Sequence, residues 1–199
     1  MADYASLALL KQSLGITDTV DDTLLSTALT TASRFIDGHC GRTFEVAAGT
    51  ATRDYAPTGR YDVLYIDDAT SIVSVRIDDD LDYSFGTTLA NIDYQLEPLN
   101  GIAGGIATPY YALRPYEDGY WPLSIRGRRA TVRVEATFGW AAVPDAIEQA
   151  TVIQASRIFK RLDSPLGVAG FGDMGAMRVS SRVDPDVAML IGPYRKLLF

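Results

Sequence analysis

The residue types that most often carry enzyme chemistry are scarce in this 199-residue chain. His39 and Cys40 are its only histidine and its only cysteine, and they are adjacent in the sequence. Neighbouring residues at the end of a helix do not point at each other, so they do not form a nucleophile and its base. A disulfide within the chain and a zinc site of cysteines and histidines are also excluded. With no serine elbow, no Gly-Lys-Ser/Thr loop and no His-Glu-x-x-His motif, the sequence predicts a protein that is not an enzyme and has no cofactor.

Acidic residues gather after an apolar run that ends at Ile77. Asp78, Asp80 and Asp82 have the alternating spacing of the first ligands of a calcium loop, but the glycine and the distal glutamate of that loop are missing. The pattern therefore favours the acidic tip of a β-hairpin, and a weak cation site is the alternative.

Residues 170–175 satisfy the pattern Gly-x-Gly-x-x-Gly. The dinucleotide-binding fingerprint needs a strand before these glycines and a helix after them. The sequence predicts a helix before them instead, so a flexible arm is favoured over a nucleotide site.

The charge balance argues against a protein that grips DNA. The chain has 18 basic and 25 acidic side chains, a formal net charge of −7. Its one basic cluster, formed by Arg126, Arg128 and Arg129, is too small for tight DNA binding at physiological salt, and a solvated turn is the simpler interpretation. There is neither a secretory signal nor an apolar stretch of about 18 residues, so we expect no membrane partner.

Three helices are predicted, over residues 4–14, 20–38 and 144–162. Leu25, Leu29, Ala32 and Ile36 give the second helix a single apolar stripe. The third helix is apolar around most of its circumference, which indicates burial on several sides, in part against a neighbouring subunit. The residues expected in that subunit contact are Ile147, Val152, Ile153, Ile158 and Phe159.

Between residues 50 and 140 the sequence is typical of strands. Apolar and polar residues alternate from Val132 to Phe138, and β-branched runs occupy 63–66 and 72–77. We therefore predict an α+β fold: a small bundle of three or four helices, an inserted β region and an extended C-terminal arm.

The predicted arm covers residues 164–199. It combines glycines with apolar and basic side chains that could dock onto another surface. Folding back onto its own domain is the alternative. The docking residues that we expect are Arg178, Val179, Arg182, Leu190, Tyr194, Arg195, Leu197, Leu198 and Phe199.

Several motifs together resemble one protein family. They are the segment Leu9–Ile16, the pattern Cys40-Gly41-Arg42-x-Phe44, the segment Phe138–Pro144 and the run Asp184-Pro185-Asp186-Val187. In this order and spacing the sequence is similar to the head–tail connector (adaptor) proteins of tailed bacteriophages.

The resemblance implies a structural protein of the virion neck, made in the host cytoplasm. Such proteins form a ring, usually of twelve copies, that sits below the portal protein and extends the DNA channel toward a stopper or tail-terminator protein. By this resemblance residues 1–163 are the connector domain, and the arm docks onto the portal. DNA would pass without specific binding, and the acidic side chains expected to face the channel are Asp78, Asp79, Asp80 and Asp82.

Two other functions stay open at this point. The chain could be a different ring protein of the neck or the tail-completion machinery. It could also be a module that binds a small ligand or carbohydrate through its tyrosine-rich β region.

Overall fold

A computed structural model describes most of the chain. The described residues are 2–57, 62–116, 121–122, 129–161, 168–170, 176–178 and 183–196, with the backbone alone for 168–170 and 176–178. The chain divides into two compact units. Residues 1–45 and 143–199 form the helical unit, and residues 46–142 form the β unit inserted into it.

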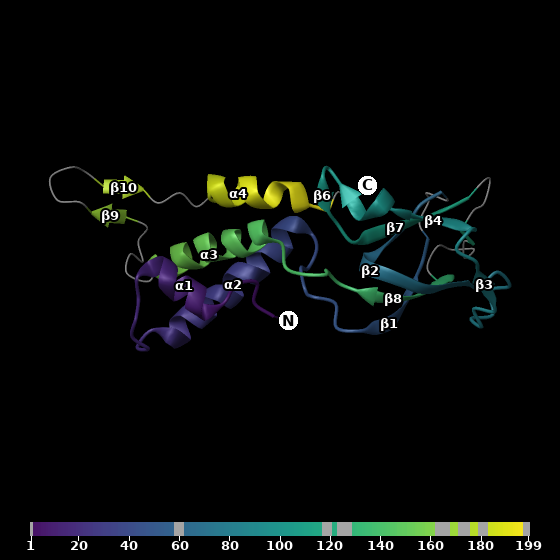
Figure 1. The fold of residues 1–199 in the computed structure, drawn as a ribbon, viewed down its shortest axis with the longest axis horizontal. Coiled ribbons are helices and arrows are strands. Elements are labelled where there is room, and N and C mark those ends of the chain that lie inside the picture. Colours follow the sequence, from purple (N-terminus) through teal and green to yellow (C-terminus); the bar gives the residue numbers. More distant parts are fainter. Residues whose placement is uncertain are drawn as a thin grey trace. The chain divides into compact units, whose positions relative to one another are not determined.

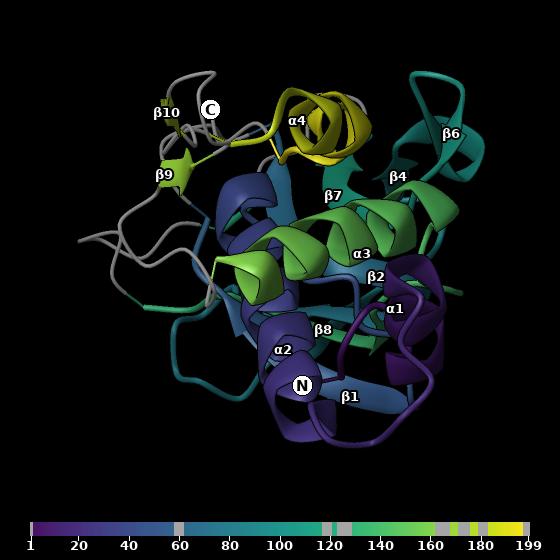
Figure 2. The same ribbon diagram turned by 90° about the vertical axis from the view of Figure 1, so that its left-hand side faces the viewer.

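The helical unit is built on α1 (Leu7–Leu14), α2 (Asp22–Cys40), α3 (Asp145–Lys160) and α4 (Pro185–Ile191). Helix α3 packs against each of the other three, and α4 lies on the opposite side of α3 from α1 (Figures 1 and 2). In the described residues, no helix is both long enough and apolar enough to cross a membrane.

Local signals set the ends of the first two helices. The side chain of Ser6 accepts a hydrogen bond from the backbone N–H of Leu9, so α1 begins at Leu7 and not at the predicted residue 4. Gly15 and Gly41 follow α1 and α2 with φ of 71° and 66°, a left-handed conformation that glycine adopts without a steric penalty. Helix α2 begins at Asp22, two residues after the predicted start.

The core of the helical unit contains the apolar stripe of α2 that the sequence predicted. Leu25, Leu29 and Ala32 are buried there together with Val152 and Ala155 of α3. Most of the stability of α2 therefore comes from this packing, because an isolated helix of its length is marginal in water.

The β unit contains an antiparallel sheet of six strands in the order β1-β8-β2-β7-β4, with β3 paired to the far end of β2. A separate small hairpin joins β5 to β6. The strands are β1 (Thr50–Tyr55), β2 (Leu64–Ile77), β3 (Thr87–Leu89), β4 (Tyr94–Glu97), β5 (Ile102–Ala103), β6 (Ile106–Ala107), β7 (Tyr110–Pro115) and β8 (Val132–Phe138). A 3-10 turn, η1 (Leu99–Gly101), follows β4.

Alternation along β8 is as the sequence predicted. Val132, Val134 and Ala136 are fully buried, and the residues between them are half-buried. Strand β8 pairs with β1 on one side and with β2 on the other, so its buried side chains lie in the core of the sheet. The fold is therefore α+β, a helical bundle with an inserted antiparallel sheet, as predicted.

Two short strands lie in the segment predicted to be without regular structure. Strand β9 (Val168–Gly170) pairs antiparallel with β10 (Ala176–Arg178). Strand β9 thus ends at Gly170, where the sequence predicted no strand, but the next described element is another strand and not a helix. This arrangement differs from a dinucleotide-binding turn.

Candidate functional site

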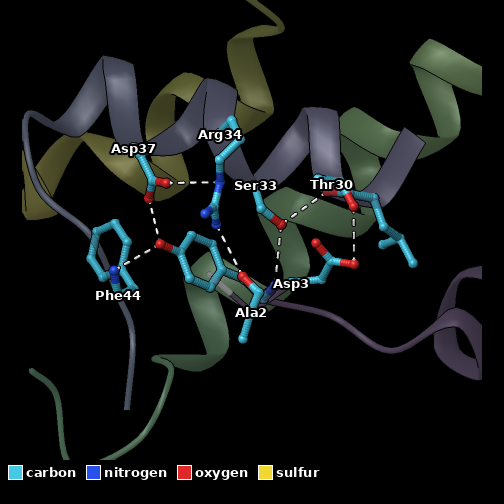
Figure 3. A network of polar contacts seen from close by, with 9 residues as sticks. Ala2, Asp3, Thr30, Ser33, Arg34, Asp37 and Phe44 are labelled. Atoms are coloured by element: carbon cyan, nitrogen blue, oxygen red, sulfur yellow. Dashed lines mark hydrogen bonds and ion pairs between the residues drawn. The ribbon is translucent and has the colours of Figure 1, made fainter. Parts of the chain in front are cut away.

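The N-terminal segment is attached to α2 by a network of polar contacts (Figure 3). At its centre the Tyr4 hydroxyl donates a hydrogen bond to Oδ1 of Asp37, with 2.5 Å between the oxygens, and accepts one from the backbone N–H of Phe44 at 2.9 Å. The guanidinium of Arg34 forms an ion pair with Oδ2 of Asp37 at 3.1 Å. Arg34 and Asp37, from the second half of α2, thus share one part-buried cluster with Tyr4 and Phe44, which come before and after the helix.

Further contacts extend the network toward the first residues of the chain. The backbone N–H of Tyr4 donates to Oγ of Ser33 at 3.1 Å, and Arg34 donates to the backbone carbonyl of Ala2 at 3.0 Å. Burial and the hydrogen bond to Asp37 raise the pKa of Tyr4, so its hydroxyl stays protonated. Burial also raises the pKa of Asp37, against the effects of Tyr4 and Arg34. The network attaches the N-terminal segment to α2.

The side chains of His39 and Cys40 have different surroundings and different partners. The His39 ring stacks on Phe35, with 6.3 Å between ring centroids. Cys40 is buried and its sulfur lies 3.8 Å from the carbonyl oxygen of Ile191. Burial raises the pKa of the Cys40 thiol to about 11, so it is neutral and unreactive near pH 7.

The acidic turn, residues 78–85, joins β2 to β3, which pair antiparallel from Ile77 and Thr87 onward. It is the hairpin tip that the sequence predicted. Asp78 is fully buried, and both of its carboxylate oxygens accept the backbone N–H of Tyr83, at 3.0 and 3.1 Å. Leu81, Tyr83 and Phe85 all have positive φ, so this carboxylate stabilises a backbone that changes direction repeatedly. Asp78 is therefore a structural residue, and it cannot face a channel without unfolding the turn.

The other three aspartates of the turn are exposed. Asp82 accepts a hydrogen bond from the backbone N–H of Ser84, and contacts with Ser84 lower its pKa. One carboxylate oxygen from each of Asp78, Asp80 and Asp82 lies within 4.8 Å of the others. A channel-facing role for Asp79, Asp80 and Asp82 stays a prediction.

Arginines pack against the aromatic rings of the same turn. The guanidinium of Arg133 lies 4.0 Å from the centroid of Phe85, and that of Arg129 lies 4.8 Å from the centroid of Tyr83. Arg129 also donates to the backbone carbonyl of Leu81 at 2.7 Å. This member of the predicted basic cluster is thus used to hold the turn, and Arg126 and Arg128 lie outside the described residues.

The apolar residues of α3 are divided between two environments. Ile147 and Val152 are buried within the helical unit, which explains their apolar character without a neighbouring subunit. Ile153, Ile158 and Phe159 are half-buried. Of these, Ile158 and Phe159 also pack on the core of the helical unit. A subunit contact along this helix stays a prediction.

Residues 183–196 pack against the chain's own helices, which was the alternative considered for the predicted arm. Val187 and Ile191 of α4 are fully buried, and α4 packs on α3. Beyond α4, in the 3-10 turn η3 (Gly192–Tyr194), the ring of Tyr194 meets Phe44 edge to face at 5.9 Å. The backbone N–H of Lys196 donates to the carbonyl of Cys40 at 2.8 Å. This part of the arm is consequently a fourth component of the helical unit.

The docking residues expected from the sequence fall into three groups. Leu190 and Tyr194 are half-buried, and Arg195 is exposed. Arg178 is described by its backbone alone. The others, which are Val179, Arg182, Leu197, Leu198 and Phe199, lie outside the described residues.

Sequence reasoning missed the network around Tyr4. Its partners Ser33, Arg34 and Asp37 are about thirty residues away along the chain. The only local sign is a polar patch beside the apolar stripe of α2, and such a patch is also typical of a solvated helix face.

Residues 4–95 match the model of the family described as phage gp6-like head-tail connector protein. The matched range includes α1, α2, the Cys40–Phe44 motif and the first half of the sheet. No curated protein matches the chain at a significant level.

Solved structures with a similar fold come from gene transfer agent particles. One chain from a structure described as the neck of an empty GTA particle computed with C6 symmetry has a TM-score of 0.54 and 16% sequence identity. Another, from a virion of a native gene transfer agent particle, has a TM-score of 0.51 and 18% identity. Each comparison covers 98% of this chain and 91% of the solved chain, so the likeness in fold includes both units. The family match agrees with what the sequence motifs indicated: residues 4–95 are similar to the head–tail connector family.

Proposed function

We propose that this protein is a structural component of the neck of a tailed phage-like particle, where it joins the head to the tail. The observation that carries the proposal is the match of residues 4–95 to the head-tail connector family. The similar fold of a chain from a particle neck, over nearly the whole length, supports it. The chemistry of the described residues agrees with a structural role, because the buried polar groups of the helical unit hold its own backbone.

A ring is the assembly that this role requires, since the neck surrounds a channel through which DNA passes. The solved neck with C6 symmetry supports a rotationally symmetric arrangement. Twelve copies are the number that we propose from the family resemblance. A closed ring uses a different surface on each side of every copy, so the chain needs two complementary contact surfaces.

DNA is a passenger in this proposal and not a ligand. With a net charge of −7 on each copy, a ring is strongly acidic. An acidic wall does not release counterions from DNA, so it does not retain the duplex as a basic channel would. The exposed carboxylates of Asp79, Asp80 and Asp82 are the part of the β unit that we propose for this wall.

The proposed partners are a portal protein on one side and a stopper or tail-terminator protein on the other. For the portal contact we propose the outer face of residues 183–196. There Met189 is 72% exposed and Arg195 is exposed, whereas Val187 and Ile191 face inward. Asp186 is exposed on the same segment, so the surface carries both signs of charge, and its basic end at Arg195 suits an acidic site on the partner.

The experiment that tests this function uses the whole chain with the portal protein encoded by the same particle. The two proteins are co-purified, and the complex is measured by native mass spectrometry and imaged by electron cryomicroscopy. We expect a ring of this chain at the outer end of the portal. A chain that stays monomeric with portal present, and particles whose necks lack it, would contradict the proposal.

A further inference from the structure

The six-stranded sheet of the β unit is open, and it ends in two strands that have a partner on one side only. Strand β1 pairs with β8 and strand β4 pairs with β7, and no other described strand pairs with the outer edge of either one. Figure 1 shows β1 and β4 at opposite margins of the sheet. Each outer edge therefore presents backbone N–H and C=O groups that a further strand could bind.

Neither edge strand has the features that usually prevent a sheet edge from pairing with another chain. Such features are proline, a bulge, or charged side chains that stay free at the edge. The sequences of β1 and β4 are Thr-Ala-Thr-Arg-Asp-Tyr and Tyr-Gln-Leu-Glu, which contain no proline, glycine or lysine. The pairing of each strand with its one partner is continuous, without a bulge. Both edges are thus regular enough to accept another strand.

The charged side chains of both edge strands are paired within their own sheet. Arg53 of β1 forms an ion pair with β2, and Asp54 forms one with β8, each with 2.7 Å between nitrogen and oxygen. Glu97 of β4 is paired with Arg114 of β7 at 2.9 Å. Because each of these charges already has its counter-ion, neither edge repels an approaching strand through a free charge.

Large apolar side chains are exposed on both sides of β4. Ile92, just before the strand, is 77% exposed, and Leu99 and Ile102, just after it, are 59% and 55% exposed. The half-exposed Tyr116 is held beside the start of β4, because its backbone N–H donates to the carbonyl of Asp93 at 3.0 Å. Pairing along the four residues of β4 alone would bury too little surface for a specific interface. These neighbouring side chains supply the additional apolar area.

The strand that fits the β4 edge is β1 of another copy. Its first five residues are exposed, two of them are threonines, which are favoured in strands, and it is long enough to pair with all of β4. The two strands cannot pair within one chain, since four strand spacings, about 19 Å, separate them across the sheet. A contact between two different edges is heterologous, and this is the kind of contact that a ring repeats.

We propose that β1 of one copy pairs with β4 of the neighbouring copy, so that the sheets of adjacent copies continue into one another around the ring. This inference rests on the proposed ring and names one of its contacts. Neighbouring strands are antiparallel throughout the path from β1 to β4, so these two strands point the same way within one chain. Adjacent copies of a large ring differ by a small rotation, and the new pairing is therefore parallel.

Disulfide cross-linking of the whole chain, assembled with its portal protein, tests this contact. The chain's one cysteine, Cys40, is buried, so added cysteines report their own contacts. Ala51→Cys with Gln95→Cys puts one thiol on each edge, and Thr52→Cys with Gln95→Cys samples the opposite face of β1. A disulfide needs Cα atoms within about 7 Å, which excludes a bridge inside one chain. We expect one of these two pairs to give a ladder of cross-linked oligomers on a denaturing gel.

Matched variants locate the contact. Ala51→Cys with Val73→Cys also carries two exposed thiols, but Val73 lies on β2 inside the sheet, so this pair should give no ladder. Added to the cross-linking pair, Ile92→Asp should lower the yield of the ladder by about fivefold or more, because it puts a charge into the apolar part of the contact. Val20→Asp makes the same change at an exposed residue of the helical unit, and should leave the yield within about twofold. Thermal unfolding of each variant checks that it is folded.

The inference is overturned if neither edge pair gives more ladder than the control pair with Val73→Cys, or if Ile92→Asp and Val20→Asp lower the yield equally. A ring of this chain at the portal would, in either case, still support the neck function. A ladder from a chain that forms no ring at the portal would have the opposite meaning: the edges pair as proposed, and the proposed function is wrong.

Discussion

The backbone N–H of Lys196 donates a hydrogen bond to the carbonyl of Cys40, with 2.8 Å between nitrogen and oxygen. This bond joins the last described residue to the end of α2, where the carbonyl would otherwise lack a partner within the helix. The same region places Cys40 against Ile191 and Phe44 against Tyr194. The segment after α3 therefore returns to the helical unit and completes its core.

Removing apolar contacts of α4 should destabilise the whole helical unit. Ile191→Ala deletes a fully buried side chain and should lower the free energy of unfolding by about 2–5 kcal/mol. Met189→Ala, on the same helix with 72% exposure, should change it by less than about 0.5 kcal/mol. Urea denaturation followed by circular dichroism measures both. Equal effects of the two variants would mean that α4 does not pack as described.

A consequence for truncation follows from the same contacts. Deleting residues 184–199 removes Val187 and Ile191 from the core, so it would impair folding as well as docking. Shortening the chain to Lys196 keeps both of these buried side chains, so a loss of docking in that variant is separate from a loss of folding.

The Tyr4 hydroxyl should contribute to stability through its two hydrogen bonds. Tyr4→Phe keeps the ring and leaves the N–H of Phe44 and a carboxylate oxygen of Asp37 without this partner. We expect a loss of about 1–3 kcal/mol in the free energy of unfolding. Tyr116→Phe, at a half-exposed ring, is the matched control and should have almost no effect. An unchanged stability of Tyr4→Phe would show that the network contributes no net free energy.

The elements of this fold were predictable where local periodicity decides them, and the long-range contacts were not. The stripe from Leu25 to Ile36 repeats at the period of a helix, and the alternation from Val132 to Phe138 repeats at that of a strand, so both could be read directly. The return of α4 onto the helical unit was only the alternative prediction, because the glycines of 167–175 favour flexibility, while the compensating contact joins Cys40 to Ile191, 151 positions apart. The periodicity of a short sequence segment does not indicate which residue will contact it from so far along the chain.

Stability should fall between about pH 9 and pH 11 in part because of Cys40. Its pKa is raised from 9.0 to about 11 in the folded chain. Below pH 9 the thiol is neutral in the folded and unfolded states, whereas above it the unfolded thiol ionises first and unfolding becomes easier. Urea denaturation at pH 8, 9.5 and 10.5 measures the decline.

A variant separates this contribution from those of the tyrosines. Burial also raises the pKa values of Tyr4 and Tyr55, so they act in the same direction at higher pH. Cys40→Ala should therefore show a shallower decline than the unmodified chain, without abolishing it. A decline of equal steepness would mean that the thiol ionises as easily in the folded state as in the unfolded one.

Within the acidic turn, the structure separates a residue that holds the fold from those available for function. Asp78→Asn replaces a carboxylate oxygen that accepts the N–H of Tyr83 by an amide group, at a fully buried position. The amide oxygen of Asn can still accept the N–H of Tyr83. Its NH2 group, however, places a buried donor where a carboxylate oxygen was an acceptor. We expect a loss of about 1–3 kcal/mol in the free energy of unfolding.

Asp80→Asn is the matched control, because it makes the same chemical change two residues away at an exposed side chain. Its effect on stability should stay below about 0.5 kcal/mol. If these two variants behaved alike in urea denaturation, Asp78 would not hold the turn. If only Asp78→Asn unfolds more easily, a test of the acidic channel wall should change Asp79, Asp80 and Asp82 and leave Asp78 in place. A change in DNA passage then reports the surface charge and not the unfolding of the turn.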